Sequence, residues 1–304
     1  MSDTFFIIGI FAFIFILWIG SGGPNRPLAL SGPILHGTDS VFPKASGVFY
    51  KDVHLSNTIK KIKTTSAVKT LSDFETLSPY SGRITLGHYV SGADNINSSR
   101  EYVTLRVTTN TTPIDITGWT LKSSASGVSA HIPKGTEVPR SGIVNQTQDI
   151  ILRPGDDAII SSGRSPIGGS FRENICIGYF AQYQSFYPTL PLTCPIPFTE
   201  LKDNYRNGGG NYMRDLACIN YTRSLNRCSV VTTPPVNLSS SCAKFLTTYL
   251  NYNGCVNAHE HDSYFKNKTW RIYLNRDKSM WRTHYDSVEL LDKNGKLVDM
   301  FSYQ

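Results

Sequence analysis

From Tyr80 onward, hydrophobic and polar positions follow the two-residue period of half-buried β-strands. An Asn294-Gly295 pair separates two apolar runs near the C-terminus, and Asn-Gly readily adopts the positive φ angles of a two-residue type I′ turn. We therefore expect residues 288–303 to form a hairpin, with Trp119 as a core anchor of the same sandwich. Turn residues separate the other expected strands at intervals typical of a β-sandwich: residues 83–90, 101–108, 116–121, 128–132, 149–152 and 158–161.

Between residues 172 and 268 the apolar period changes to that of helices. One predicted helix carries Cys218, Tyr221, Leu225 and Cys228, and a second carries Cys242, Phe245, Leu246, Tyr249 and Leu250. Ser239–Ser241 is expected to cap the second helix, Asn253-Gly254 to end it, and a loop at Pro234-Pro235 to join the two. Strand character resumes at residues 270–274, so the helices are interpreted as an insertion, residues 172–268, into a sandwich spanning residues 80–304.

The N-terminal region divides into an apolar stretch and a spacer. Residues 5–19 are uncharged and span about 22 Å as a helix, short for a hydrocarbon core of about 30 Å. Because the leader Met-Ser-Asp lacks Lys and Arg, residues 1–22 are interpreted as an uncleaved membrane anchor, with a cleaved signal peptide as the alternative. Residues 23–79, rich in Gly, Pro and Ser, are predicted to be a linker, in which Lys60, Lys61 and Lys63 form a solvated charge run.

All six cysteines lie between residues 176 and 255, without a Cys-x-x-Cys pair. This pattern favours disulfides in an oxidising space over a zinc site, and it places the body of the protein on the extracytoplasmic side of the membrane. Because two antiparallel helices would bring the ends of one beside the ends of the other, the expected bonds are Cys228–Cys242, Cys218–Cys255 and Cys176–Cys194.

The charge pattern suggests a nucleic-acid-binding surface, for which a purely structural explanation is also available. The net charge is +7, and a basic surface suits nucleic acid, although a solvated surface without a specific partner is the simpler explanation. The arginines to test for nucleic-acid contacts are Arg100, Arg106, Arg140, Arg153, Arg164 and Arg172.

His259 and His261 are the candidates for a metal site, but their spacing separates them on a helix, which favours a polar turn. Asp156 and Asp157 could be paired carboxylates or calcium ligands, whereas a turn closed by the Asp156 side chain is favoured. Neither a nucleophile elbow nor a phosphate loop is present in the sequence. We expect no catalytic residues and no cofactor.

Three separated motifs resemble, in order, those of a lamin-tail domain: residues 101–107, then 114–121 with Gly118-Trp119, and the Pro154-Gly155-Asp156 turn before the C-terminal hairpin. Residues 18–24, 78–82, 176–180, 186–195, 249–256 and 270–274 also resemble segments of membrane-anchored lamin-tail proteins from Patescibacteria-like candidate-phylum bacteria. The resemblance implies an immunoglobulin-like β-sandwich and an anchored, non-catalytic interaction or structural protein with a protein partner. Two alternatives stay open: extracellular nucleic-acid binding, because lamin-tail domains are often joined to secreted nucleases, and a metal-dependent hydrolase using His259 and His261.

Overall fold

The computed structural model describes residues 77–93, 97–108, 112–207 and 214–304. The predicted anchor at residues 1–22 lies outside them, as do the predicted charge run at Lys60–Lys63 and all but the last residues of the predicted linker. No helix in the described residues is long and apolar enough to span a membrane.

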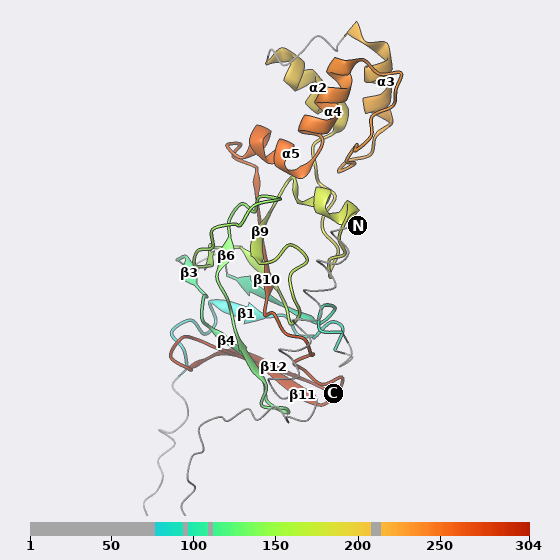
Figure 1. Ribbon diagram of the computed structural model, residues 1–304. Coiled ribbons are helices and arrows are strands. Elements are labelled where there is room, and N and C mark those ends of the chain that lie inside the picture. Colours follow the sequence, from blue (N-terminus) through green and yellow to red (C-terminus); the bar gives the residue numbers. More distant parts are fainter. Residues whose placement is uncertain (1–76, 94–96, 109–111, 208–213) are drawn as a thin grey trace, which may run out of the picture. The chain divides into compact units, whose positions relative to one another are not determined.

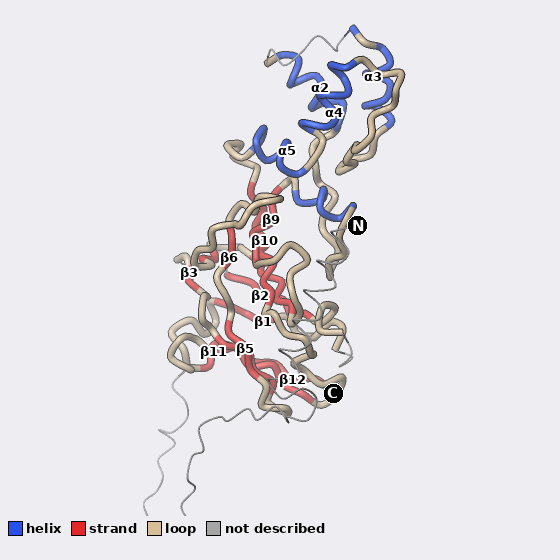
Figure 2. The backbone as a smooth tube through the Cα atoms, viewed as in Figure 1, coloured by secondary structure: helices blue, strands red, loops and turns tan. Residues whose placement is uncertain are grey.

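The described chain is mainly β, with two larger sheets and a small one (Figures 1 and 2). The six-stranded sheet has the order β1-β2-β8-β10-β9-β6; it is antiparallel except where β10 pairs with β8 and β6 with β9. Its strands are β1 (Ile84–Leu86), β2 (Tyr102–Val107), β6 (Gly135–Thr136), β8 (Asp157–Ser161), β9 (Ser170–Asn174) and β10 (Lys266–Tyr273). The four-stranded antiparallel sheet has the order β12-β11-β4-β5; its strands are β4 (Thr120–Ser123), β5 (Ser129–His131), β11 (Asp286–Leu291) and β12 (Leu297–Tyr303). In the small sheet, β3 (Ile114–Asp115) pairs with β7 (Ile151–Leu152).

One hydrophobic core joins the two larger sheets and confirms the predicted β-sandwich. It contains alternate residues of β1, β2, β8 and β10 from one sheet, and from the other it contains Leu121 of β4, Val288 and Leu290 of β11, and Val298 and Phe301 of β12. Trp119 is buried in this core and packs on Tyr80, with ring centroids 5.1 Å apart. Fully burying an aliphatic side chain stabilises a fold by about 1.5–3 kcal/mol, so the core provides the main driving force for this assembly.

The C-terminal hairpin is confirmed, but its turn is of a different type. Only Gly295 has a positive φ, at +74°, whereas a type I′ turn needs positive φ at both central residues. The amide of Gly295 donates to the carbonyl of Asp292 at 3.0 Å, and the amide of Asp292 donates to the carbonyl of Lys296 at 2.9 Å. The loop therefore has three residues, with Gly295 in the left-handed position that commonly follows a type I turn.

Several strands differ from the prediction in length or position. The predicted strand at residues 116–121 is interrupted, because Asp115 Oδ1 accepts a hydrogen bond from the Thr117 amide at 2.9 Å and Gly118 turns the chain with φ +78°. Strand β3 ends before this turn and β4 starts after it. The sequence pattern also missed β6 and β9, since β9 (Ser170–Asn174) is buried on both faces and does not alternate.

The helices lie between β9 and β10 in the chain, as expected, but they are more numerous than the two predicted. They comprise the 3-10 helix η3 (Ile177–Gln182) and the α-helices α2 (Pro197–Arg206), α3 (Leu216–Ser224), α4 (Ser240–Tyr249) and α5 (Tyr252–His259). Ser239 caps α4 as predicted, its Oγ accepting from the Cys242 amide at 3.2 Å. The predicted stop at Asn253-Gly254 is wrong, because both residues lie inside α5, which Asn251 caps by accepting from the Gly254 amide at 2.9 Å.

All six cysteines form disulfides, but the predicted pairing is wrong. The bonds are Cys176–Cys255, Cys194–Cys228 and Cys218–Cys242. The prediction assumed that Cys228 ends the first helix, whereas α3 ends at Ser224 and Cys228 lies in the following turn with φ +63°. Cys218 is therefore the cysteine of α3 that faces α4. Cys255, on a separate helix after the break at Asn251, joins the start of η3 instead.

Candidate functional site

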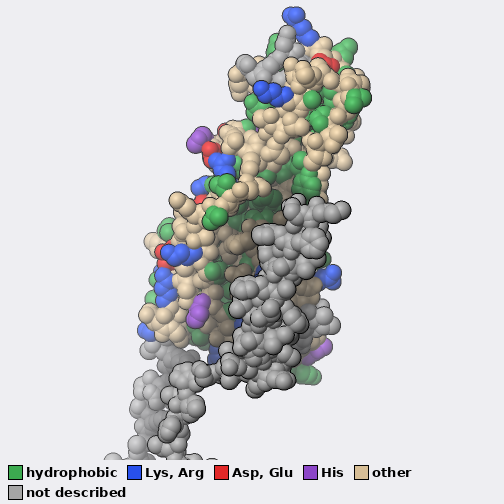
Figure 3. All heavy atoms as spheres, viewed as in Figure 1, with side chains coloured by type: hydrophobic (Ala, Val, Ile, Leu, Met, Phe, Trp, Pro, Cys, Tyr) green, Lys and Arg blue, Asp and Glu red, His purple; other side chains and the backbone are tan. Residues whose placement is uncertain are grey.

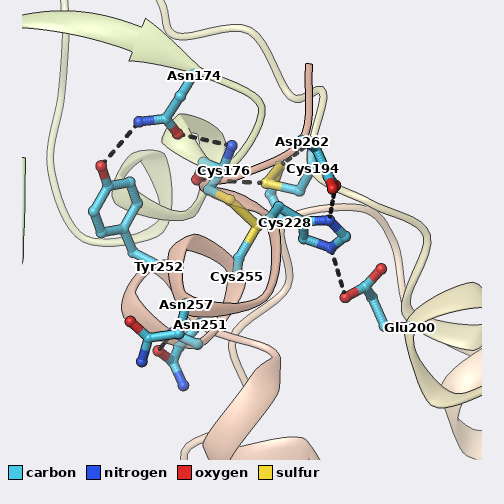
Figure 4. The surroundings of a disulfide bond; sticks show 12 residues. Asn174, Cys176, Cys194, Glu200, Cys228, Asn251, Tyr252, Cys255, Asn257 and Asp262 are labelled. Atoms are coloured by element: carbon cyan, nitrogen blue, oxygen red, sulfur yellow. Dashed lines mark hydrogen bonds and ion pairs between the residues drawn. A yellow bond between two sulfur atoms is a disulfide. The ribbon is translucent and has the colours of Figure 1, made fainter. Parts of the chain in front are cut away.

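His259 and His261, the sequence candidates for a metal site, do not act together. His259 Nε2 lies 3.0 Å from Glu200 Oε2 and its Nδ1 lies 2.7 Å from Asp262 Oδ2; Figure 4 shows the two carboxylates on either side of the imidazole. The hydrogen bond to Glu200, opposed by burial and reinforced by Asp262, raises the pKa of His259 to about 9. Each ring nitrogen thus faces a carboxylate of the protein, so the arrangement is that of an ion-pair network in which His259 joins Glu200 to Asp262. The His261 side chain is exposed, and a carboxylate oxygen of Glu260 lies 3.9 Å from it.

A second group of ligand-type side chains, at the start of α3, is structural as well. Within the described chain, Asp215, Cys218 and Cys242 each place one ligand atom within 4.8 Å of the others. The two sulfur atoms are bonded to each other, and Asp215 caps α3 by accepting from the Cys218 amide at 3.0 Å. A sulfur atom in a disulfide is not a thiolate, so this arrangement staples α3 to α4 rather than offering a metal site.

Asp156 closes the turn before β8, as predicted. Its Oδ2 accepts from the Arg153 amide at 2.9 Å, and its Oδ1 accepts from Arg172 at 3.2 Å. Burial raises the pKa of Asp156, although these partners oppose the change. Asp157 pairs instead with Arg106 on β2. The two neighbouring carboxylates thus serve different partners and do not form one site.

The six arginines proposed for nucleic-acid contacts do not form a patch. Arg153 and Arg172 share Glu137, with nitrogen–oxygen distances of 3.7 and 3.6 Å. The others are spread over the molecule: Arg106 pairs with Asp157, Arg140 with Glu260 and Arg164 with Asp277, while Arg100 lies over the Tyr187 ring. On the face drawn in Figure 3, basic side chains are scattered and several lie beside acidic ones. Five of the six would have to exchange a carboxylate for a phosphate, so this geometry does not favour nucleic-acid binding.

An exposed loop between β6 and β7 is held in place by side-chain amides. In this clamped loop, residues 139–145, the Asn145 side chain holds both backbone groups of Arg140: its Oδ1 accepts from the amide at 2.6 Å and its Nδ2 donates to the carbonyl at 2.9 Å. Asn253 on α5 holds Ser141 in the same way, at 3.0 and 2.9 Å. Two side-chain amides thus replace the backbone pairing that a strand would provide, and they fix the loop on α5.

Charged groups add to the attachment of the clamped loop. The Arg140 guanidinium bonds to Glu260 Oε2 at 2.5 Å and also donates to Asn257 on α5. Helix α5 is itself tied to the start of η3 by the Cys176–Cys255 disulfide (Figure 4). The loop is therefore connected through α5 and this bond to the end of β9, which gives it a fixed position on the scaffold.

The fixed loop presents two aliphatic side chains to solvent. Ile143 is 65% exposed and Val144 is 97% exposed. A hollow of about 440 Å³ lies on one side, between the loop and Phe180 and Tyr183 at the end of η3, and one of about 280 Å³ lies on the other side. Both hollows share Pro139, Ile143, Asn145 and Ile167 in their walls. Apolar side chains on a rigid loop, flanked by hollows, form a surface suited to binding another molecule rather than to catalysis.

Sequence analysis missed this loop. Its sequence, in which Pro139, Gly142 and an Ile143-Val144 pair lie among polar residues, has no periodicity that predicts a strand or a helix. The decisive contacts join Ser141 to Asn253, residues 112 positions apart in the chain.

No family model matches the chain, and no curated protein matches it either.

Proposed function

We propose that the protein is a non-catalytic interaction protein, held at the outer side of a membrane by its N-terminal apolar stretch, which binds a partner through the clamped loop. The exposed Ile143 and Val144 on a loop fixed by two side-chain amides are the observation that carries this proposal. Exposing two adjacent aliphatic side chains is unfavourable in water, so a partner that covers them gains hydrophobic free energy on binding. Because the loop is already ordered, association costs less conformational entropy.

The disulfides support the proposed compartment. Three bonds use every cysteine of the chain, as is usual in extracellular proteins and rare where glutathione keeps thiols reduced. The bond between Cys176 and Cys255 also holds the helix on which the loop rests. Oxidation therefore organises the proposed binding surface as well as stabilising the fold.

The lamin-tail motifs support the proposed fold family. The Gly118-Trp119 pair lies at the turn before β4, the Pro154-Gly155-Asp156 turn leads into β8, and the closing hairpin joins the same core. A two-sheet sandwich with these features is consistent with an immunoglobulin-like lamin-tail domain, with the helices α2 to α5 as an insertion. Such sandwiches commonly bind partners through loops rather than through catalytic clefts, although fold alone does not establish function.

The proposal is tested by capture with the full-length chain. The wild-type chain, an Ile143→Ser/Val144→Ser variant and a matched Leu216→Ser/Val236→Ser variant, whose changed side chains are also exposed, are presented to the surface proteins of producing cells. We expect one protein to be enriched by the wild-type and matched chains and lost with the loop variant, as identified by mass spectrometry. Equal recovery by all three chains, or no specific recovery by the wild-type chain, would refute the proposal.

A further inference from the structure

The outer face of the six-stranded sheet carries a trough of about 520 Å³ that is separate from the clamped loop. It runs across β1, β2, β8 and β10, and it shares no residue with the hollows beside the loop. Four of its side chains form one row, because Thr85, Arg106, Asp157 and Thr269 are successive cross-strand partners. We call this feature the outer trough.

A glycine next to β1 keeps the outer trough open at this strand. Gly87 follows β1, and its amide donates to the Thr104 carbonyl at 2.8 Å. A Cβ atom at this position would lie 2.2 Å from Thr104 Oγ1, so any side chain would have to displace the threonine. The absence of a side chain at Gly87 leaves the Thr104 hydroxyl accessible at the floor of the trough.

The outer trough mixes apolar side chains, Ile159 among them, with a row of polar groups that carries little net charge. Arg106 and Asp157 pair at 2.7 Å, and the arginine side chain is 75% exposed, so donors of the guanidinium remain available. The hydroxyls of Thr85, Thr104 and Thr269 make no side-chain hydrogen bond within the described residues. Together these groups offer both donors and acceptors without a net charge.

An aromatic ring stands at the rim. Tyr89 lines the trough beside His88, and its side chain is 57% exposed. An exposed ring that lines the same trough as hydroxyls and a paired arginine and aspartate suits a ligand that has one apolar face of C–H groups and a rim of hydroxyls. Sugar rings have this chemistry.

We infer that the outer trough binds a segment of an uncharged polysaccharide. Tyr89 stacks on the C–H face of a sugar ring, while the threonine hydroxyls and the Arg106–Asp157 pair hydrogen-bond to sugar hydroxyls. A polyanion such as nucleic acid fits less well, because Asp157 neutralises Arg106 and would itself lie near the phosphates. The inference is independent of the proposed function, which rests on a different surface.

The test is affinity electrophoresis of the full-length chain through gels that contain dextran, mannan, xylan or a mixed-linkage β-glucan, with heparin and single-stranded DNA as anionic probes. We expect retardation by at least one neutral polysaccharide, unchanged when the salt concentration is raised. Tyr89→Ala should weaken this binding by about tenfold, the size of one lost aromatic contact, and Tyr89→Phe should retain it. Thr104→Val, which removes the hydroxyl with little change of shape, should also weaken it.

The matched control is Tyr285→Asn, which removes another exposed tyrosine at a residue whose positive φ asparagine tolerates. It should bind as the wild-type chain does. The inference is overturned if no neutral polysaccharide retards the chain, if Tyr89→Ala binds like the wild type, or if only the anionic probes bind and salt abolishes that binding.

Discussion

His259 should make the stability of the protein depend on pH between neutral and alkaline conditions. Its imidazolium joins Glu200 on α2 to Asp262, which follows α5 and lies 62 positions after Glu200 in the chain. His259→Gln removes the titrating group and can bond to only one of the two carboxylates at a time. The wild-type chain should therefore be more stable than the variant wherever the ring is protonated.

The magnitude follows from the raised pKa. In the folded protein the pKa of His259 is about 9, against 6.5 for an unperturbed ring, and each unit corresponds to about 1.4 kcal/mol, which gives about 3 kcal/mol in all. Because the folded pKa is the higher one, the folded state binds the proton more tightly. The contribution is fully present below pH 6.5, falls as the pH rises and is lost above pH 9.

The assay is urea unfolding of the wild-type chain and His259→Gln with the disulfides intact, at several pH values from 6 to 10. We expect the difference in unfolding free energy to shrink by about 3 kcal/mol across this range, while other titrating groups cancel between the two chains. The control is His261→Gln, which replaces a nearby histidine whose side chain is exposed; this variant should be as stable as the wild-type chain at each pH. A difference between wild type and His259→Gln that stays constant or grows with pH would contradict the reasoning.

Three further predictions concern individual contacts that hold the fold together. Glu101 is fully buried and accepts hydrogen bonds from Ser162 and from two backbone amides of the segment before β11. Glu101→Gln should therefore lower the unfolding free energy, measured by urea unfolding, by about 1–3 kcal/mol. An unchanged urea midpoint would contradict this account. Replacing both Cys218 and Cys242 by serine removes a disulfide between residues 24 positions apart and should lower the stability of the helical insertion by about 3 kcal/mol. Hydrogen exchange should become faster in α3 and α4 and stay unchanged in β2 and β8. An equal acceleration in the strands would contradict a local stabilising role for this disulfide. Asn253→Ala should release the clamped loop, so that the Ser141 amide exchanges faster while the Gly295 amide, as an internal control, does not; unchanged Ser141 exchange would show that Asn253 does not hold the loop.

The parts of the fold that could be predicted from sequence depend on short-range patterns. The alternation in residues 101–108 and the apolar runs around Asn294-Gly295 each lie within about 16 residues. Strand β2 and the hairpin of β11 and β12 are found where these patterns placed them. Trp119 was recognisable as core because Ile116 and Leu121 flank it in the sequence, although a turn at Gly118 separates Ile116 from it in the structure. The turn type was not predictable in the same way, since Asn-Gly also fits a three-residue loop in which only the glycine has a positive φ.

The disulfide pairing and the clamped loop could not be predicted for a different reason. Helix ends decide which cysteines face each other, and α3 ends four residues before Cys228 while a new helix begins at Tyr252. Similarly, Asn253 is an ordinary helix residue until the fold brings α5 beside Ser141, whereas Asn145 reaches Arg140 within the loop itself. Contacts between residues more than 100 positions apart depend on the whole topology, which local periodicity does not encode.

The proposed binding role of the clamped loop is tested most directly by placing a photo-crosslinking amino acid at position 144 of the full-length chain in producing cells, with the same substitution at Val236 as the control. Both side chains are exposed, but only Val144 lies on the loop. The account predicts one discrete crosslinked partner from position 144, absent from position 236 and lost when Asn253→Ala frees the loop. The same crosslinked products from both positions, or none from position 144, would contradict it.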